Sequence, residues 1–256
     1  MQIARQRLAR VARFLRTEAG PLAILAVGLY ALYLFLHITS ETLFEGEGRA
    51  FDEGVLNALR VAGQPDAPVG PVWLPEMARD LSSLGSISVL VFVAAVVIGF
   101  ALVRKRYGAS TMIFIALAGG MVVVQALKQH FERERPPLAY HLEPVINASF
   151  PSGHAMLSAV FYLTLAVLLA RVQQQKRMKV YVIAVAVVST AMVGLTRIYL
   201  GVHWTTDVLA GWSVGCAWAV ACWFLSFAWE RLAHRKMSEQ GPPVFGHAAE
   251  ESAASP

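Results

Sequence analysis

The sequence predicts an all-α membrane protein that crosses the bilayer six times, with both termini in the cytoplasm. The first observation is composition: 56% of the 256 residues are hydrophobic and only 15% are charged, against about 45–50% and about 25% in soluble domains. The second is that six long runs contain no Asp, Glu, Lys or Arg: 19–40, 81–103, 107–127, 144–170, 180–196 and 208–229. Five of them reach the ~20 residues that a spanning helix needs, and 180–196 must use its flanks.

The runs predict helices because backbone groups in lipid must be satisfied within the segment or in a closed barrel. Barrel strands are about ten residues long and alternate in polarity, which these runs do not. A mean hydropathy of +0.52 also excludes a disordered chain, a coiled coil or a nucleic-acid-binding domain, despite a net charge of +5. Cys216 and Cys222 lie in an apolar run and are interpreted as packing residues, not as a disulfide or metal pair.

The distribution of Lys and Arg predicts the orientation. If the six spans alternate, 15 of the 22 basic residues fall on one side, and the positive-inside rule places that side in the cytoplasm. Segments 41–80, 128–153 and 197–207 then face outward. The inner set is Arg5, Arg7, Arg10, Arg13, Arg16, Arg104, Lys105, Arg106, Arg171, Lys176, Arg177, Lys179, Arg231, Arg235 and Lys236.

Three parts of the chain are expected. Residues 1–18 form a basic cytoplasmic segment, interpreted as an amphipathic helix on the inner leaflet, and 19–236 form the transmembrane domain. Residues 237–256 are rich in Gly, Pro, Ala, Ser and Glu and are predicted to be disordered. The run 19–40 is interpreted as an anchor and not as a cleaved signal peptide. Residues 51–60 predict a short outer helix; for this helix and the N-terminal one, a solvated linker is the alternative.

Polar residues gather where three outward segments meet the ends of the spans. The segments are 128–136 (KQHFERERP), 151–154 (PSGH) and 197–207 (RIYLGVHWTTD). Polar groups at this depth are costly to bury, so they are treated as a functional site by default. Although far apart in sequence, the three clusters share one face of the membrane, so we expect their side chains to act together.

The first chemical feature of these clusters is anion binding. Lys128, Arg135 and Arg197 are cations that can converge on one group, and Arg suits bidentate contact with phosphate. Ser152 is a favoured N-cap, and the N–H groups of a first helical turn bind anions. Gly153 allows close approach of the backbone. The sequence therefore predicts a phosphate ligand.

The second feature is a reactive imidazole. His203 and Asp207 are four residues apart, so they lie on one face if the last span begins near Trp204. A carboxylate at one imidazole nitrogen fixes the tautomer and leaves the other nitrogen free to attack. His203 is therefore the candidate nucleophile, and His154 is a candidate general acid for the leaving oxygen.

Each element has a structural alternative. Lys128 and Arg135 alone are typical of interfacial snorkelling residues, and Ser-Gly-His alone is typical of a plain helix cap. His203 with Asp207 resembles part of a metal site, but no third ligand lies at metal-site spacing. Glu132, Glu134, His141 and Glu143 are interpreted as solvated loop residues. The match of 147–149 to a glycosylation sequon is common by chance.

Together the three clusters resemble the type 2 phosphatidic acid phosphatase (PAP2) superfamily, whose pattern is K-x6-R-P, P-S-G-H and S-R-x5-H-x3-D. Lys128 to Pro136 and Pro151 to His154 match the first two elements. Arg197, His203 and Asp207 match the third, in which Thr196 replaces the leading Ser. The similarity covers roughly residues 20–230. Each motif is weak alone, but three in order are specific.

The resemblance implies a fold and a mechanism. His203 would form a phosphohistidine supported by Asp207, and His154 would protonate the leaving group and later activate water. Phosphate-binding roles would fall to Lys128, Arg135, Ser152, Gly153 and Arg197. No metal and no cofactor is expected. The implied setting is a bacterial inner membrane, with the site facing the periplasm or exterior.

A lipid phosphate or diphosphate is the expected substrate, because the site lies at the edge of the bilayer. Undecaprenyl diphosphate is the lead, since an outward site suits recycling of a carrier released there. Phosphatidic acid, phosphatidylglycerol phosphate and lipid A phosphates remain alternatives. A non-catalytic lipid transporter or binding protein is the alternative of another class, and the spans argue against a haloperoxidase. The sequence predicts no nucleic-acid partner and leaves the oligomeric state open.

Overall fold

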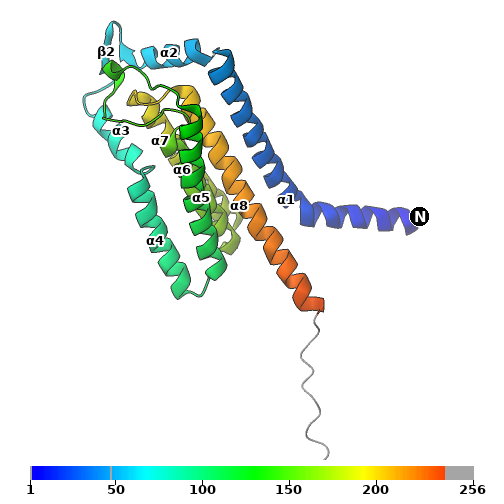
Figure 1. The fold of residues 1–256 in the computed structure, drawn as a ribbon. Helices are drawn as coiled ribbons and strands as arrows, with labels where there is room; N and C mark the ends of the chain where they lie inside the picture. The colour runs from blue at the N-terminus through cyan, green and yellow to red at the C-terminus, as the bar shows by residue number, and fades with distance from the viewer. Residues whose placement is uncertain (1, 47, 240–256) are drawn as a thin grey trace, which may run out of the picture.

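Helices make up most of the protein, for which a computed structural model describes residues 2–46 and 48–239. Figure 1 shows a bundle of long helices with short elements gathered at one end. The elements are α1 (Gln2–Thr39), η1 (Ser40–Glu45), α2 (Gly48–Ala58), β1 (Arg60–Val61), β2 (Gln64–Pro68), α3 (Leu74–Ser83), α4 (Ile87–Val103), α5 (Tyr107–Phe131), η2 (Leu138–Tyr140), α6 (Gly153–Val172), α7 (Lys176–Tyr199) and α8 (Thr205–Glu239).

The membrane-spanning architecture predicted from the sequence is confirmed. Five helical segments are long and apolar enough to span: Ala19–Leu43, Tyr107–Phe131, Gly153–Val172, Lys176–Tyr199 and Thr205–Arg231. The sixth span is a bent pair, α3 and α4, which meet at 45°. The predicted run 81–103 therefore contains a break. Ser86 begins α4 there because its Oγ accepts a hydrogen bond from the Val89 amide at 3.4 Å.

Two other runs have different helical limits from those expected. The run 144–170 becomes a helix only from Gly153, and the residues before it form a loop over the end of the bundle. The short run 180–196 extends through its flanks to Lys176–Tyr199, as expected. Lengthening gives α7 24 residues, enough to cross the hydrocarbon core at 1.5 Å per residue.

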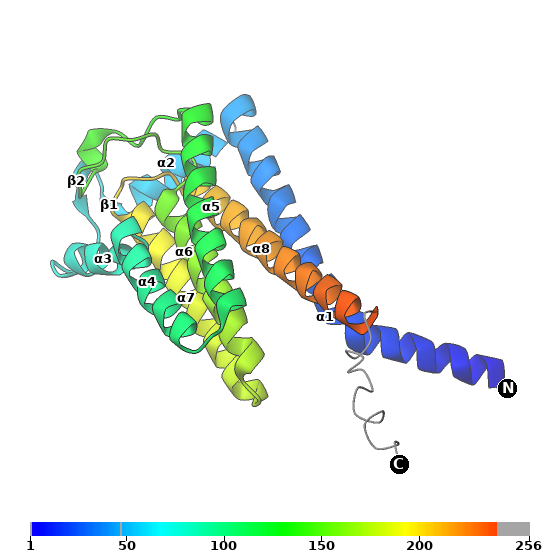
Figure 2. The ribbon, with the colours of Figure 1, turned by 60° about the horizontal axis from the view of Figure 1, so that its bottom comes forward.

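The terminal segments extend the bundle at one end. The N-terminal segment is helical from Gln2, and α1 bends in its N-terminal half, where Pro21 cannot donate a backbone hydrogen bond. The bent-away part of α1 and the last turns of α8 lie at the same end of the molecule (Figures 1 and 2). Their cytoplasmic location stays a prediction. The predicted disordered tail is helical up to Glu239, and residues 240–256 lie outside the described residues.

Small residues set the close contact between α6 and α8, which both begin at the end of the bundle opposite the chain termini. A Cβ on Gly211 would lie 2.7 Å from the Ser152 carbonyl oxygen, and one on Gly215 would lie 2.6 Å from that of Met156. Small residues on α6 face both glycines. Membrane helices pack closely through such small-xxx-small patterns. The packing brings the first turn of α8 against the start of α6.

Loops and short elements cover that same end. The β1–β2 hairpin, which the sequence analysis did not predict, packs there together with α2 and η2. Arg60 ties these elements together because its guanidinium donates to the carbonyls of Tyr140 at 2.7 Å and Tyr199 at 3.1 Å. The short helix predicted at 51–60 is present as α2, although it ends at Ala58 and Arg60 belongs to β1. Its location at the outer face stays a prediction. This cover encloses the ends of α5, α6, α7 and α8, where the three polar clusters lie.

Candidate active site

The three polar clusters meet at one end of the bundle. Lys128 lies in the last turn of α5, and Gly153 and His154 begin α6. Arg197 is in the last turn of α7, and Asp207 is in the first turn of α8. Because these helix ends point the same way, residues separated by up to 79 positions become neighbours.

His203 and Asp207 form a buried pair. His203 lies in the short loop between α7 and α8, and its Nδ1 is 3.3 Å from Asp207 Oδ2. The side chains are 2% and 0% exposed, so water does not compete for this contact. The pair is held by the turn itself, because Asp207 Oδ2 also accepts the backbone N–H of Trp204 at 2.9 Å. This is one half of a capping box, in which a residue of the first turn reaches back to the cap.

Arg135 identifies the histidine tautomer. Its Nη1 lies 3.3 Å from His203 Nε2. A guanidinium has only donors, so Nε2 must be the unprotonated, accepting nitrogen, and Nδ1–H must donate to Asp207. The lone pair of Nε2 therefore points toward the cationic cluster, where it accepts from Arg135. Arg135 is fixed in this position because it donates to the carbonyl of Val202 and, through Nη2, to Asn147 Oδ1 at 2.6 Å.

Asp207 has further partners that the sequence analysis missed. Arg133 Nη1 donates to Asp207 Oδ1 at 2.5 Å, and the Ser149 hydroxyl donates to Oδ2. Arg133 also bridges to Asp52 Oδ2 at 2.9 Å, and Asp52 is only 1% exposed. Asp52 in turn accepts the backbone N–H of Thr206 at 2.9 Å. A buried network therefore links α2, the loop after α5 and the first turn of α8.

Arg197 extends the cationic surface from the α7 side. It is 2% exposed, and its Nη1 donates to Ser82 Oγ at 2.8 Å and to Glu143 Oε1. The interpretation of Glu143 as a solvated loop residue is therefore wrong. No local sequence pattern indicates this pair, because Glu143 lies 54 residues before Arg197. The loop before α6 folds back and brings the carboxylate to Arg197.

Two buried donors in the site have no hydrogen-bond partner among the described residues: Arg197 Nε and the Ser152 hydroxyl. Ser152 takes the N-cap position of α6, as predicted, but its side chain does not cap the helix. Its backbone N–H donates to the Asp207 carbonyl at 3.0 Å, which fixes its position. Buried polar groups are nearly always satisfied, so unpaired donors beside a cationic cluster indicate an anion site.

The start of α6 completes the cluster. A Cβ on Gly153 would lie 3.8 Å from Lys128 Cε, so the helix start and the lysine stem are in contact range. Lys128, 7% exposed, donates from Nζ to the Ala148 carbonyl. His154 lies next to Gly85 at the α3–α4 break, where a Cβ would be 3.3 Å from His154 Cβ. The lack of a side chain at Gly85 therefore lets the α3–α4 break pack closely against this histidine.

Electrostatics show that the predicted residues share one neighbourhood. Burial lowers the pKa of the His203 imidazole well below its ordinary value of 6.5. Nearby groups lower the pKa further, in the order Arg135, Arg197, Lys128 and His154. Burial also lowers the pKa of Arg135 to about 10, and Arg197 adds to that effect. His203 is therefore held neutral at physiological pH, the form in which it can act as a nucleophile.

A cavity of about 480 Å³ opens beside Arg135. It lies between η1 and the loop after α5, and its lining includes Leu43, Arg49, Arg133 and Trp204.

All eight sequence-predicted residues lie at this end of the bundle. Four residues that contact the site were not predicted from the sequence: Arg133, Asp52, Ser149 and Ser82. Among them only Arg133 carried a signal, its basic charge in the outward segment. Within the described residues, no three His, Cys, Asp or Glu side chains form a group that could hold a metal.

Comparisons with known proteins show which family the chain resembles. The family model described as PAP2 superfamily matches residues 108–231. Phosphatidylglycerophosphatase B of Bacillus subtilis is 31% identical over 72% of this chain and 88% of its own length. An undecaprenyl-diphosphatase of Sulfolobus acidocaldarius is 30% identical over 56% of this chain and 58% of its own length.

One solved structure has a similar fold. The crystal structure of a transmembrane PAP2-type phosphatidylglycerolphosphate phosphatase from Bacillus subtilis superposes with a TM-score of 0.64 and 27% identity. The match covers 86% of this chain and 98% of the other. With the motifs, the site and the extent of these matches together, the chain belongs to the PAP2 superfamily and is an integral membrane protein.

Proposed function

We propose that this protein is a phosphatase that hydrolyses lipid phosphates or diphosphates at the outer face of the membrane, through a phosphohistidine. One observation carries the proposal: the unprotonated Nε2 of His203 faces a cluster that contains Lys128, Arg135 and two unpaired buried donors. A neutral imidazole beside concentrated positive charge suits attack on a phosphoryl group.

The first step forms a phosphorus–nitrogen bond. His203 Nε2 attacks phosphorus in line with the leaving oxygen, whose bond to phosphorus breaks. Nδ1–H stays on the ring, and Asp207 stabilises the positive charge that the ring gains. His154 donates its proton to the leaving oxygen, which departs as the alcohol or as the shorter phosphate. The negative phosphate beside His154 favours its protonated form before this step.

The second step reverses these roles. His154, now neutral, takes a proton from water, and the oxygen attacks phosphorus. The phosphorus–nitrogen bond breaks, inorganic phosphate leaves, and His203 returns to its neutral form. Lys128, Arg135 and Arg197, with Ser152, Gly153 and the first N–H groups of α6, stabilise the charge on the transferring group. In this mechanism cations and N–H groups supply what a metal supplies elsewhere.

The geometry favours a lipid as the carrier of the phosphate. The site lies at the ends of spanning helices, and the cavity beside Arg135 begins at Leu43, the last residue of the first span. A lipid can therefore reach Arg135 with its chains still in the bilayer. The charge distribution supports an inner membrane with this end in the periplasm or exterior.

Undecaprenyl diphosphate is our first candidate substrate, and phosphatidylglycerol phosphate is the second. Relatives carry both activities in their names, and the match with the phosphatidylglycerophosphatase is the longer of the two. Because of this longer match, phosphatidylglycerol phosphate should be tested as thoroughly as undecaprenyl diphosphate. Phosphatidic acid and lipid A phosphates share the same phosphomonoester chemistry and complete the panel.

The test is phosphate release by the purified protein from those four lipids, with wild type and His203→Ala. We expect turnover of at least one lipid, abolition by the substitution, and retained lipid binding. Unchanged turnover in the variant would remove His203 as nucleophile, and binding without turnover in wild type would support a non-catalytic protein. Vanadate is expected to inhibit as a mimic of the pentacoordinate phosphoryl group. Strong inactivation by EDTA would contradict the metal-free mechanism.

A further inference from the structure

A cavity near the opposite end of the bundle plays no part in the proposed reaction. Its volume is about 690 Å³, and it lies where α4, α5, α6 and α8 come together, close to the turn between α4 and α5. Gly108 lines it, 20 residues before Lys128 on α5, which is about 30 Å at 1.5 Å per residue. The volume is within the range of about 300–1,000 Å³ that small-molecule sites occupy.

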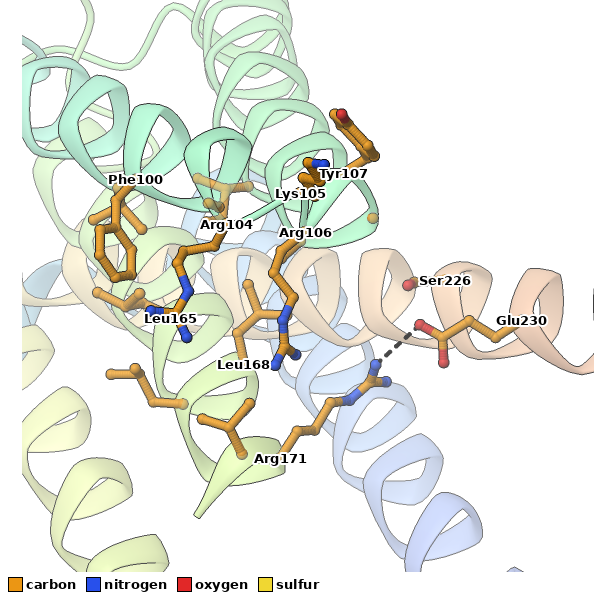
Figure 3. A pocket seen from close by; sticks show the side chains of 17 residues that line it. Phe100, Arg104, Lys105, Arg106, Tyr107, Leu165, Leu168, Arg171, Ser226 and Glu230 are labelled. Carbon is orange, nitrogen blue, oxygen red and sulfur yellow. Dashed lines mark hydrogen bonds and ion pairs between the residues drawn. The ribbon is translucent and has the colours of Figure 1, made fainter.

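The cavity has a basic rim. Arg104, Lys105 and Arg106 form the turn between α4 and α5, and all three are exposed. Figure 3 shows the side chains of Arg104 and Arg106 extending from that turn across the cavity toward Leu165 and Leu168 of α6. Among the described residues none of the three has a side-chain hydrogen bond or ion pair. Their charge is therefore available to a ligand.

The fourth cation at the cavity differs from these three. Arg171 pairs with Glu230 at 3.2 Å and lies over the Trp223 ring at 5.8 Å from its centroid. Glu230 is the only acidic residue among those that line the cavity, and it is already engaged. The rim is therefore strongly complementary to a ligand with negative charge.

Most of the remaining lining is hydrocarbon. It includes Val97, Phe100, Ile113, Leu165, Leu168 and Leu169, and only Tyr107 and Ser226 add hydroxyl groups. These apolar residues belong to α4, α5 and α6, which are spanning helices, so we expect them to meet lipid chains. A soluble anion would leave this surface without a partner. A ligand with an anionic head and an apolar chain matches both parts.

We propose that this cavity binds one anionic phospholipid, with its phosphodiester between Arg104 and Arg106 and its acyl chains against Leu165 and Leu168. Basic pockets between membrane helices bind anionic headgroups through this combination. The positive-inside rule explains why cations lie at this end but predicts neither a cavity nor an apolar lining beneath them. The proposal concerns binding only and does not depend on the proposed reaction.

The experiment is a native mass spectrometry titration of the full-length protein in detergent. Phosphatidylglycerol is compared with phosphatidylcholine of the same chains, for wild type and the double variant Arg104→Gln/Arg106→Gln. Lys176→Gln/Arg177→Gln is the matched control, because it removes the same charge from the next turn at this end without touching the cavity. We expect wild type to prefer phosphatidylglycerol. The Arg104→Gln/Arg106→Gln variant should bind one molecule fewer, with affinity weaker by about 30-fold, and the control should match wild type.

A second variant tests the apolar part of the site. Leu169→Trp adds bulk to the cavity lining at a residue that is 40% exposed, and leaves every cation in place. It should also lose the bound lipid. If the double variant and its control lose the same affinity for phosphatidylglycerol, the effect comes from general surface charge, and the proposal is overturned. Equal binding of phosphatidylcholine, or displacement of the lipid by inorganic phosphate at the same concentration, would also overturn it.

Discussion

The two ends of this bundle both concentrate positive charge, but they hold it differently. At the His203 end, Lys128 and Arg197 are 7% and 2% exposed, and each cation donates to a named carbonyl, hydroxyl or carboxylate. At the other end, Arg104 and Arg106 are exposed and extend over a hydrocarbon surface. Buried charge must be fixed by partners, because an unpaired buried ion is very costly. An exposed charged side chain needs no such partner.

The difference predicts how each end responds to substitution. At the His203 end the groups depend on one another, so removal of one partner changes the geometry of the rest. At the other end each cation acts almost independently, and its loss should weaken binding by a similar, modest factor.

The largest effect is expected for Asp207→Asn. The carboxylate accepts through both oxygens, whereas the amide has one acceptor oxygen and one donor group. With the donor group against Nδ1, the amide favours the wrong tautomer of His203. We expect kcat to fall by about 10³–10⁴-fold with little change in KM. Steady-state phosphate release measures this. The exposed Asp66→Asn is the control for a charge change at the same end, and a comparable loss there would show that the effect is not specific to the pair.

Asp52→Asn tests whether the missed network positions the site. This carboxylate is 1% exposed and holds Arg133, which holds Asp207. Removal of one partner of a buried pair costs about 3–5 kcal/mol, so both the Tm and kcat should fall. Glu53→Gln is a matched control on the same helix, because Glu53 pairs with Arg49 at side-chain exposures of 49% and 76%. Its expected change is under about 1 kcal/mol, and equal Tm losses would contradict the network.

Gly211→Ala tests the close packing of α6 and α8. The added Cβ would lie 2.7 Å from the Ser152 carbonyl oxygen, so the helices must separate near the Ser152–Asp207 contact. We expect a stability loss of about 1–3 kcal/mol, visible as a lower Tm, together with reduced kcat. On α4, a Cβ at Gly99 has no atom within 4 Å. Gly99→Ala should therefore be neutral, and a matching loss would show that packing is not the cause.

The smallest effect is expected from protonation of His203. Because the pKa of His203 lies well below 6.5, the nucleophile stays neutral from pH 7.5 to pH 6. Once the measured ionisation of the substrate is divided out, kcat/KM should therefore not fall as the pH is lowered over this range, whereas the proton that His154 must carry can raise it. Below pH 6.5 the unfolded chain binds a proton that folded His203 does not, so stability contributed by this residue falls as pH falls. A fall in kcat/KM between pH 7.5 and pH 6 would contradict the buried, neutral imidazole.

Local patterns in the sequence predict the spanning architecture. Long uncharged runs specify spanning helices because the bilayer imposes one local rule on every segment. The spacing of Lys128 to Arg135, and of Arg197, His203 and Asp207, indicates residues that the structure brings together. Each of these motifs fits within a dozen residues. Which residues belong to the site, and what each does, stay predictions for the experiments above.

The pairing of side chains in the site depends on how the chain folds. Asp52 reaches Asp207 through Arg133, Glu143 reaches Arg197, and the sixth span breaks beside His154. Partners of this kind depend on which loop crosses the end of the bundle, and no local pattern records that path. The cavity at the other end arises in the same way, from four helix ends that meet only after folding. The cost of burying charge in lipid determines that charged residues lie at the ends of the spans. The packing of helices and loops determines which groups those charged side chains contact.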